Sequence, residues 1–195
     1  MLSIKQRAKT FFECLPSYNE GYLEVGDGHS LYYEEYGNPN GRPVLFLHGG
    51  PGAGFSNSHK GFFDPKTFRV IFYDQRGSGK SIPYAEIKNN TTELLLSDIE
   101  CLRNFLKIDS WLLFGGSWGS TLALLYGIKY PERCKGFILR GIFLGSRKEV
   151  NWFLYDINRF FPEAYNKFIS YVPKTERDNI LNWFYSQLNA KDRSA

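Results

Sequence analysis

A serine lies between glycines in the segment FGGSWGSTLALLYG, residues 114–127, with the spacing G-x-S-x-G. In hydrolases this spacing places a nucleophilic serine on a tight turn between a strand and a helix. Small neighbours leave room for the turn, and the amino terminus of the helix favours the negative charge that develops during attack. The alternative is a glycine-rich turn whose serine only caps the helix. Because an apolar run precedes Ser117 and a helical pattern follows it, we predict Ser117 as a catalytic nucleophile.

A second glycine-rich loop, HGGPGAG at residues 48–54, also follows an apolar run. Consecutive glycines allow backbone N–H groups to point into a site without hindrance from side chains, which is how an oxyanion hole is built. The alternative is an ordinary turn. We predict a structural role for His48 rather than a role as general base.

The segment DQRGSGKS, residues 74–81, suggests a different class of protein, the nucleotide hydrolases with a phosphate-binding loop. The motif G-x-x-x-x-G-K-[ST] requires a glycine where this chain has Asp74. The helix that should follow the motif is also excluded, because Pro83 comes too soon. We therefore predict a loop in which Asp74 and Arg76 pair or hydrogen-bond to hold the floor of the site.

Short apolar runs that end in glycine-bearing loops alternate with helix-like segments along the chain. This alternation is typical of an α/β fold, with a mostly parallel sheet and helices on both of its faces. Ligands gather at the carboxyl ends of the strands in such sheets, and all three motifs follow predicted strands. The strands are predicted at residues 30–37, 44–50, 68–74, 111–116 and 136–141.

Two helices are predicted between these strands. The first covers residues 90–108, with Asn90 and Glu93 as its capping pair and Arg103 away from its apolar face. The second, which follows the G-x-S-x-G turn, is buried and stops before Pro131. The apolar face of the first helix consists of Leu95, Ile99, Leu102 and Leu106.

The spacing of aromatic residues changes from strand-like to helical at about Arg147. We predict a core domain at residues 1–146 and the start of a helical cap or lid at residues 147–195. Most aromatic side chains of the lid are expected to pack in its core, with one or two lining a substrate pocket. These side chains are Trp152, Phe153, Tyr155, Phe160, Phe161, Tyr165, Phe168, Tyr171, Trp183, Phe184 and Tyr185.

Composition excludes several functional classes. The 195 residues carry a formal net charge of +4, but lysines and arginines are interspersed with acids, so no nucleic-acid partner is predicted. The three cysteines, Cys14, Cys101 and Cys134, show no metal-binding spacing and fit a reducing compartment. Without a signal peptide or a long apolar span, we predict a cytoplasmic protein with no membrane contact.

The motifs HGGPGAG, DQRGSGKS and GGSWGSTLALLYG, together with LRGIF at residues 139–143, resemble the proline iminopeptidase family of α/β-hydrolases. The resemblance covers essentially the whole chain. It implies the α/β-hydrolase fold and an enzyme that releases N-terminal proline from peptides without a metal or organic cofactor. By resemblance, Ser117 is the nucleophile and the backbone N–H groups of Gly50 and Trp118 form the oxyanion hole.

The resemblance also implies that acidic residues of the lid bind the free amino group of the substrate. The chain offers Glu149, Asp156 and Glu163 near the start of its lid, but no motif assigns this role to any of them. The sequence predicts no oligomeric state.

A base for the serine is missing at its expected place, because His29, His48 and His59 all precede Ser117, whereas this fold uses the order Ser, Asp or Glu, His. One hypothesis is that the chain is the N-terminal part of a longer hydrolase, truncated after about the sixth strand. Such a part would be inactive alone, and it would be poorly soluble or would associate through its apolar edge. A second is a short, non-catalytic scaffold that acts as a binding or regulatory module. A third is an unusual triad completed by His48, His59 or another chain. The nucleophile also fits another α/β-hydrolase, such as an esterase or amidase.

Overall fold

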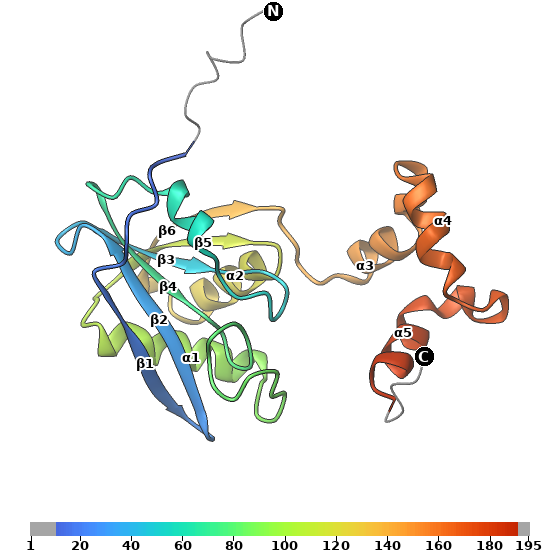
Figure 1. The fold of residues 1–195 in the computed structure, drawn as a ribbon, viewed down its shortest axis with the longest axis horizontal. Coiled ribbons are helices and arrows are strands. Elements are labelled where there is room, and N and C mark those ends of the chain that lie inside the picture. The colour runs from blue at the N-terminus through green and yellow to red at the C-terminus, as the bar shows by residue number, and fades with distance from the viewer. Residues whose placement is uncertain (1–10, 191–195) are drawn as a thin grey trace, which may run out of the picture. The chain divides into compact units, whose positions relative to one another are not determined.

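The structure, a computed structural model, describes residues 11–190 and contains two compact units, one ending at Leu144 and the other beginning at Gly145. The first unit is built on a six-stranded sheet in the order β1-β2-β4-β3-β5-β6 (Figure 1). Its elements are β1 (Asn19–Gly26), β2 (His29–Gly37), β3 (Arg42–Leu47), η2 (Asn57–Phe62), β4 (Phe68–Tyr73), α1 (Thr92–Phe105), β5 (Trp111–Gly116), α2 (Trp118–Lys129), η3 (Pro131–Arg133) and β6 (Cys134–Arg140).

The sheet is mostly parallel. β1 and β2 are antiparallel, as are β2 and β4, whereas β3, β4, β5 and β6 run parallel to one another. The predicted fold class and the five predicted strands are confirmed. The carboxyl ends of the parallel strands lie at one edge of the sheet, and the three glycine-rich motifs follow β3, β4 and β5.

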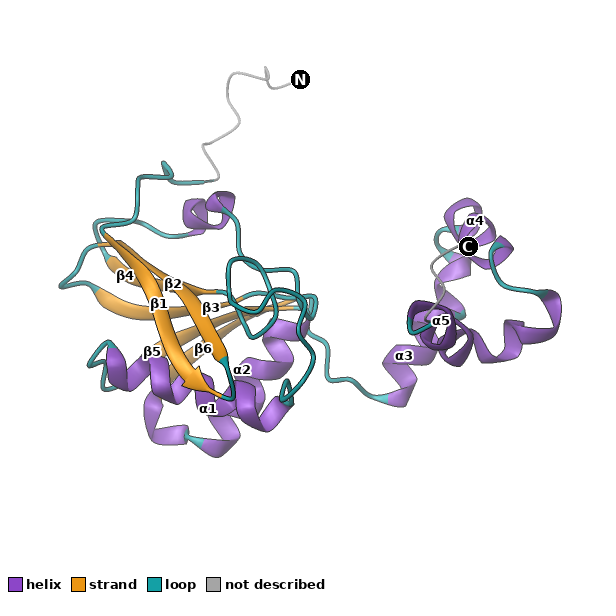
Figure 2. Ribbon diagram, turned by 60° about the horizontal axis from the view of Figure 1, so that its bottom comes forward, coloured by secondary structure: helices purple, strands orange, loops and turns teal. Residues whose placement is uncertain are grey.

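Helices α1 and α2 pack on the same face of the sheet (Figure 2). The predicted apolar face of α1 is confirmed, because its four residues all enter this core. From α2 come Leu122, Ala123 and Tyr126, which are fully buried. This packing fixes the start of α2 directly behind the end of β5. The buried apolar side chains from α1 are Leu95, Leu96, Ile99 and Leu102, with Leu106 just after its end.

The opposite face of the sheet is covered by the 3₁₀ helix η2 and the aromatic side chains around it. The Phe46 ring stacks on His59 with ring centroids 4.7 Å apart and on Phe114 with centroids 5.6 Å apart. The Phe62 ring also stacks on Phe114. Because β3 and β5 both contribute to this cluster, aromatic packing fixes these two neighbouring strands from the second side.

The predicted capping pair of α1 is wrong by one residue. Thr91 caps this helix, and its hydroxyl accepts a hydrogen bond from the N–H of Leu94. The side-chain NH₂ group of Asn90 instead donates to the carbonyl oxygen of Arg76 at 3.0 Å. Arg103, predicted away from the apolar face of α1, is nevertheless buried, and its guanidinium donates to the carbonyl oxygen of Ile108.

The second unit is helical, and α3 begins at Arg147, where the aromatic spacing changes. Its small core contains Leu154, Val172 and Ile180. Because these short helices enclose few side chains, the expectation that most aromatic residues are buried is wrong for Trp152, Phe153, Phe160, Phe161, Tyr171 and Tyr185, which are exposed. The elements are α3 (Arg147–Leu154), η4 (Asp156–Arg159), α4 (Pro162–Ser170), η5 (Lys174–Asn179) and α5 (Ile180–Leu188).

Candidate active site

Ser117 lies on a sharp turn between β5 and α2. Its dihedral angles, φ 53° and ψ −123°, are rare for a residue with a side chain and cost on the order of 1–3 kcal/mol. The turn is held by a hydrogen bond from the Ser117 N–H to the carbonyl oxygen of Arg140 at 3.1 Å. The side chain is exposed at the carboxyl edge of the sheet, immediately before the positive end of the α2 dipole. This is the strand, turn and helix context that a nucleophilic serine requires.

The glycines of the G-x-S-x-G motif are required by close backbone approaches. A Cβ atom on Gly115 would lie 2.2 Å from the carbonyl oxygen of Gly119. A Cβ atom on Gly119 would lie 2.1 Å from the carbonyl oxygen of Leu47, the last residue of β3. The first turn of α2 therefore packs directly on the end of β3, where the HGGPGAG loop begins.

The HGGPGAG loop lies against the Ser117 turn. A Cβ atom on Gly49 would lie 2.9 Å from the carbonyl oxygen of Gly116 and 3.4 Å from the Cβ atom of Ser117. Gly50 follows with φ +119°, a conformation open to glycine but not to residues with side chains. The structure thus brings into adjacent loops Ser117 and the two residues predicted to form the oxyanion hole, Gly50 and Trp118.

Gln75 connects these two loops, a function that sequence reasoning missed. Its backbone N–H donates to Nε2 of His48 at 3.0 Å, and its side-chain amide donates to the carbonyl oxygen of His48 at 2.9 Å. Its side-chain oxygen accepts a hydrogen bond from Nε1 of Trp118, also at 3.0 Å. The sequence feature that could have indicated this role is the tryptophan after Ser117, because a partly buried indole N–H needs a hydrogen-bond acceptor.

His48 is committed to this scaffold. Its ring is 2% exposed, and Nδ1 donates to the carbonyl oxygen of Gly49 while Nε2 accepts from the N–H of Gln75. The bond accepted at Nε2 requires the neutral ring, and burial lowers the pKa of His48. These contacts support the predicted structural role of His48.

The other two histidines also have partners away from Ser117. Nδ1 of His59 accepts a hydrogen bond from the N–H of Ser56, and burial followed by the charge of Arg140 lowers the pKa of His59. Nε2 of His29 lies 2.9 Å from the carbonyl oxygen of Lys88. Within residues 11–190, no hydrogen bond joins the Ser117 hydroxyl to a histidine ring.

Asp74 and Arg76 both hold the loop after β4 through hydrogen bonds, one of the two predicted alternatives, but their partners are separate, so a pair between the two residues is wrong. The Asp74 carboxylate accepts from the backbone N–H groups of Phe55 and Lys80. The Arg76 guanidinium turns away to Asp98 of α1 and donates to both of its carboxylate oxygens. Each side chain forms hydrogen bonds with a different set of buried polar groups, and together these bonds fix the loop that carries Gln75.

Two hydroxyl side chains of α2 join the Ser117 turn to the segment after β6. The Ser120 hydroxyl donates to the carbonyl oxygen of Ser117 at 2.6 Å and accepts from the N–H of Phe143. The Thr121 hydroxyl donates to the carbonyl oxygen of Phe143. Sequence reasoning assigned no role to either residue, because a serine or threonine near a helix start is common without such partners.

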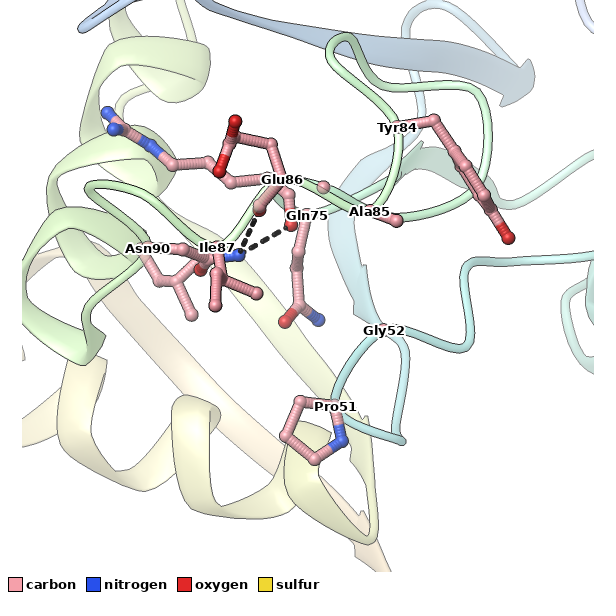
Figure 3. Close-up of a pocket in the computed structure, with 11 residues that line it drawn as sticks. Pro51, Gly52, Gln75, Tyr84, Ala85, Glu86, Ile87 and Asn90 are labelled. Atoms are coloured by element: carbon pink, nitrogen blue, oxygen red, sulfur yellow. Dashed lines mark hydrogen bonds between the residues drawn. The ribbon is translucent and has the colours of Figure 1, made fainter. Parts of the chain in front are cut away.

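A pocket of about 360 Å³ lies beside the HGGPGAG loop (Figure 3). Pro51 and Gly52 form one side, and the segment from Tyr84 to Ile87 forms another. The Asn90 amide donates to the carbonyl oxygens of Arg76 and Glu86, the two dashed bonds of Figure 3. Gln75 lines this pocket as well, so the pocket is continuous with the network that reaches Trp118. The complete lining is Pro51, Gly52, Gln75, Arg76, Gly77, Tyr84, Ala85, Glu86, Ile87, Asn90 and Leu95.

The described part of the chain offers neither a metal site nor a membrane span. No group of three or more His, Cys, Asp or Glu side chains in residues 11–190 is arranged to hold a metal ion. No helix in the same part of the chain has the length and apolar character needed to cross a bilayer.

Comparisons with known proteins agree with this architecture. A profile of the alpha/beta hydrolase fold matches residues 42–194. The chain is 49% identical over 185 residues to the probable proline iminopeptidase of Leptolyngbya boryana, covering 94% of this chain and 58% of that protein. It is 46% identical over 186 residues to the proline iminopeptidase of Arabidopsis thaliana, covering 94% of this chain and 49% of that protein. The chain therefore spans about half to three fifths of the length of these relatives.

Solved structures show the same likeness. The crystal structure of a proline iminopeptidase-related protein from Thermus thermophilus aligns with a TM-score of 0.55 and 34% identity, over 62% of this chain and 43% of that one. A mutant of Vigna radiata epoxide hydrolase aligns with a TM-score of 0.58 and 20% identity, over 87% of this chain and 54% of that one, which is a likeness of fold alone. The mostly parallel sheet, the Ser117 turn and the profile match lead to one conclusion: the chain belongs to the α/β-hydrolase fold family.

Proposed function

We propose that this chain carries the nucleophile and the oxyanion donors of a serine aminopeptidase that releases N-terminal proline from peptides. The observation that carries the proposal is the strained, exposed Ser117 between β5 and α2, with the HGGPGAG loop packed against it. Sequence similarity to proline iminopeptidases supports the choice of substrate.

In the proposed reaction, Oγ of Ser117 attacks the carbonyl carbon of the N-terminal proline residue while its proton passes to a base. The carbonyl oxygen becomes an oxyanion, which the N–H groups of Gly50 and Trp118 stabilise. The C–N bond then breaks, the shortened peptide leaves as an amine with the proton from the base, and an acyl-serine remains. Water repeats the attack and releases proline.

The base in this proposal is a histidine other than the three in residues 11–190. His48 has both ring nitrogens engaged, and His59 and His29 bond to other groups. The additional histidine would come from the same polypeptide in a longer protein or from a second chain. Without it the Ser117 hydroxyl is a weak nucleophile.

The pocket beside the HGGPGAG loop offers room for the part of the peptide that leaves. Its lining is mixed, with Ile87 and Leu95 apolar, and with Glu86 and Asn90 polar. A peptide backbone with varied side chains suits such a surface better than a purely apolar ligand.

Covalent labelling with a fluorophosphonate tests the identity of the nucleophile. We expect mass spectrometry to find the phosphonyl group on Ser117, with slow labelling because the described residues supply no base. Ser117→Ala is expected to abolish the adduct, and Ser120→Ala to retain it. An adduct on another serine would contradict the assignment, and rapid stoichiometric labelling of Ser117 would contradict the missing base.

A further inference from the structure

The loop after β4 holds the two loops of the proposed oxyanion hole together through one side chain, that of Gln75. This side chain is 3% exposed, and its amide group bonds on one side to the carbonyl oxygen of His48 and on the other to the indole of Trp118. We propose that Gln75 is a positioning residue that fixes the separation of the two oxyanion donors, an inference that rests on the proposed function.

The contacts of Gln75 make a continuous connection between the donors. Gly50 is two residues after His48, whose carbonyl oxygen and ring both bond to Gln75. The second donor, the N–H of Trp118, belongs to the residue whose indole bonds to the Gln75 side chain. A shift of Gln75 therefore moves the backbone of both loops.

The two hydrogen bonds of the Gln75 side chain fix which end of its amide faces which loop. The NH₂ group can only donate, and its partner is a carbonyl oxygen, while the side-chain oxygen accepts from an indole that can only donate. Reversing the amide would leave both partners without a bond in a buried setting. The side chain is thus locked in one orientation.

The backbone of Gln75 is itself held in place by neighbouring residues of the same loop. The Ser78 hydroxyl donates to the carbonyl oxygen of Gln75 at 2.6 Å, and the Ser78 N–H donates to the same oxygen at 3.0 Å. Arg76, the next residue, is anchored to Asp98 of α1. A rigid support of this kind is what a group needs if it is to place other groups for catalysis.

Gln75→Met tests the proposal because methionine has nearly the length of glutamine but neither donates nor accepts in the same way. We expect hydrogen exchange at the Trp118 indole N–H to accelerate at least about tenfold, and the fluorophosphonate labelling rate of Ser117 to fall about 100-fold. The probe concentration for half-maximal rate should stay the same. Rates are taken per folded molecule, so loss of stability alone does not mimic the effect.

Three comparisons sharpen this test. Gln75→Glu keeps an acceptor for the Trp118 indole and loses the donor to His48, so its indole exchange should stay near that of the unsubstituted chain. Gln187→Met, the same substitution at an exposed position of α5, should change neither rate. The buried indole of Trp111 serves as an internal reference for hydrogen exchange.

The outcomes separate this proposal from the proposed function. If Gln75→Met labels Ser117 at the unsubstituted rate, or leaves Trp118 indole exchange unchanged, Gln75 does not position the donors. If the unsubstituted chain is never labelled at Ser117, the proposed function fails. Hydrogen exchange at the Trp118 indole then still tests Gln75: accelerated exchange in Gln75→Met shows that Gln75 holds the two loops, and unchanged exchange shows that it does not.

Discussion

Arg76 and Asp98 form a bidentate ion pair in which each side chain is 1% exposed. The hydrogen bonds to Asp98 raise the pKa of Arg76, so the guanidinium stays charged inside the fold. The pair joins the loop after β4 to α1, and through this loop it supports Gln75.

Removing Asp98 should be strongly destabilising, because the buried guanidinium of Arg76 keeps only the exposed carboxylate of Asp27, at 3.3 Å, as a counterion. We expect Asp98→Ala to lower the free energy of unfolding by about 3–5 kcal/mol, measured by urea denaturation. Glu93→Ala, which removes the exposed partner of Lys129, is the matched control and should cost less than about 1 kcal/mol. Equal losses in the two variants would show that burial does not set the strength of the Arg76 pair.

The fold was largely predictable, because hydrophobic periodicity reports burial directly. The apolar runs that became β3, β4 and β5 and the four apolar positions of α1 are buried as expected. The burial of Arg103 was not predictable, because an arginine is buried only when groups such as the carbonyl oxygen of Ile108 accept its N–H groups. Such partners come from tertiary structure and leave no periodic signal.

The site was predictable where close approach of backbone segments demands a specific residue type. Glycines at positions 115 and 119 are required by contacts below 2.5 Å, and such requirements appear as a motif. The roles of Gln75 and Ser120 were missed because their partners lie 43 and 23 residues away in sequence. Asp74 and Arg76 form hydrogen bonds that hold the loop, one of the two predicted alternatives, but each bonds to a residue distant in sequence and not to the other.

Strain at Ser117 should be visible in stability. Ser117→Gly relieves the unfavourable φ of 53°, whereas Ser117→Ala keeps a side chain in the same conformation. We expect the glycine variant to be more stable than the alanine variant by about 1 kcal/mol, after the entropy that glycine adds to the unfolded chain. The measurement is the free energy of unfolding in urea. An alanine variant as stable as the glycine variant would mean that the turn stores no strain.

The free energy of unfolding should decrease as pH falls, because the buried ring of His48 is neutral in the folded protein. Burial holds the folded pKa of His48 below its ordinary value of about 6.5, so the unfolded chain binds more protons between those two values. The stability is fully present above the unfolded pKa and is lost as pH falls below it. His59 contributes with the same sign.

His48→Gln isolates this contribution, because an amide does not titrate in this range. We expect unfolding free energies at about pH 7.5 and about pH 5.5 to differ more in the unsubstituted chain than in the variant, by up to about 1.4 kcal/mol per pH unit. Carboxyl groups titrate in both proteins and cancel in the comparison. Identical pH dependence in the two would refute a neutral, buried His48 as the cause.

The central claim is that Ser117 is the nucleophile of a proline-releasing enzyme, and a chimera tests it most directly. This chain replaces the matching segment of the Leptolyngbya boryana relative, which supplies the remaining part of a protein of that family. The measurement is kcat for hydrolysis of proline p-nitroanilide, with and without Ser117→Ala. We predict that the chimera hydrolyses the substrate and that Ser117→Ala lowers kcat by at least about 1000-fold. A folded chimera that is inactive, or one whose Ser117→Ala variant is equally active, would contradict the claim.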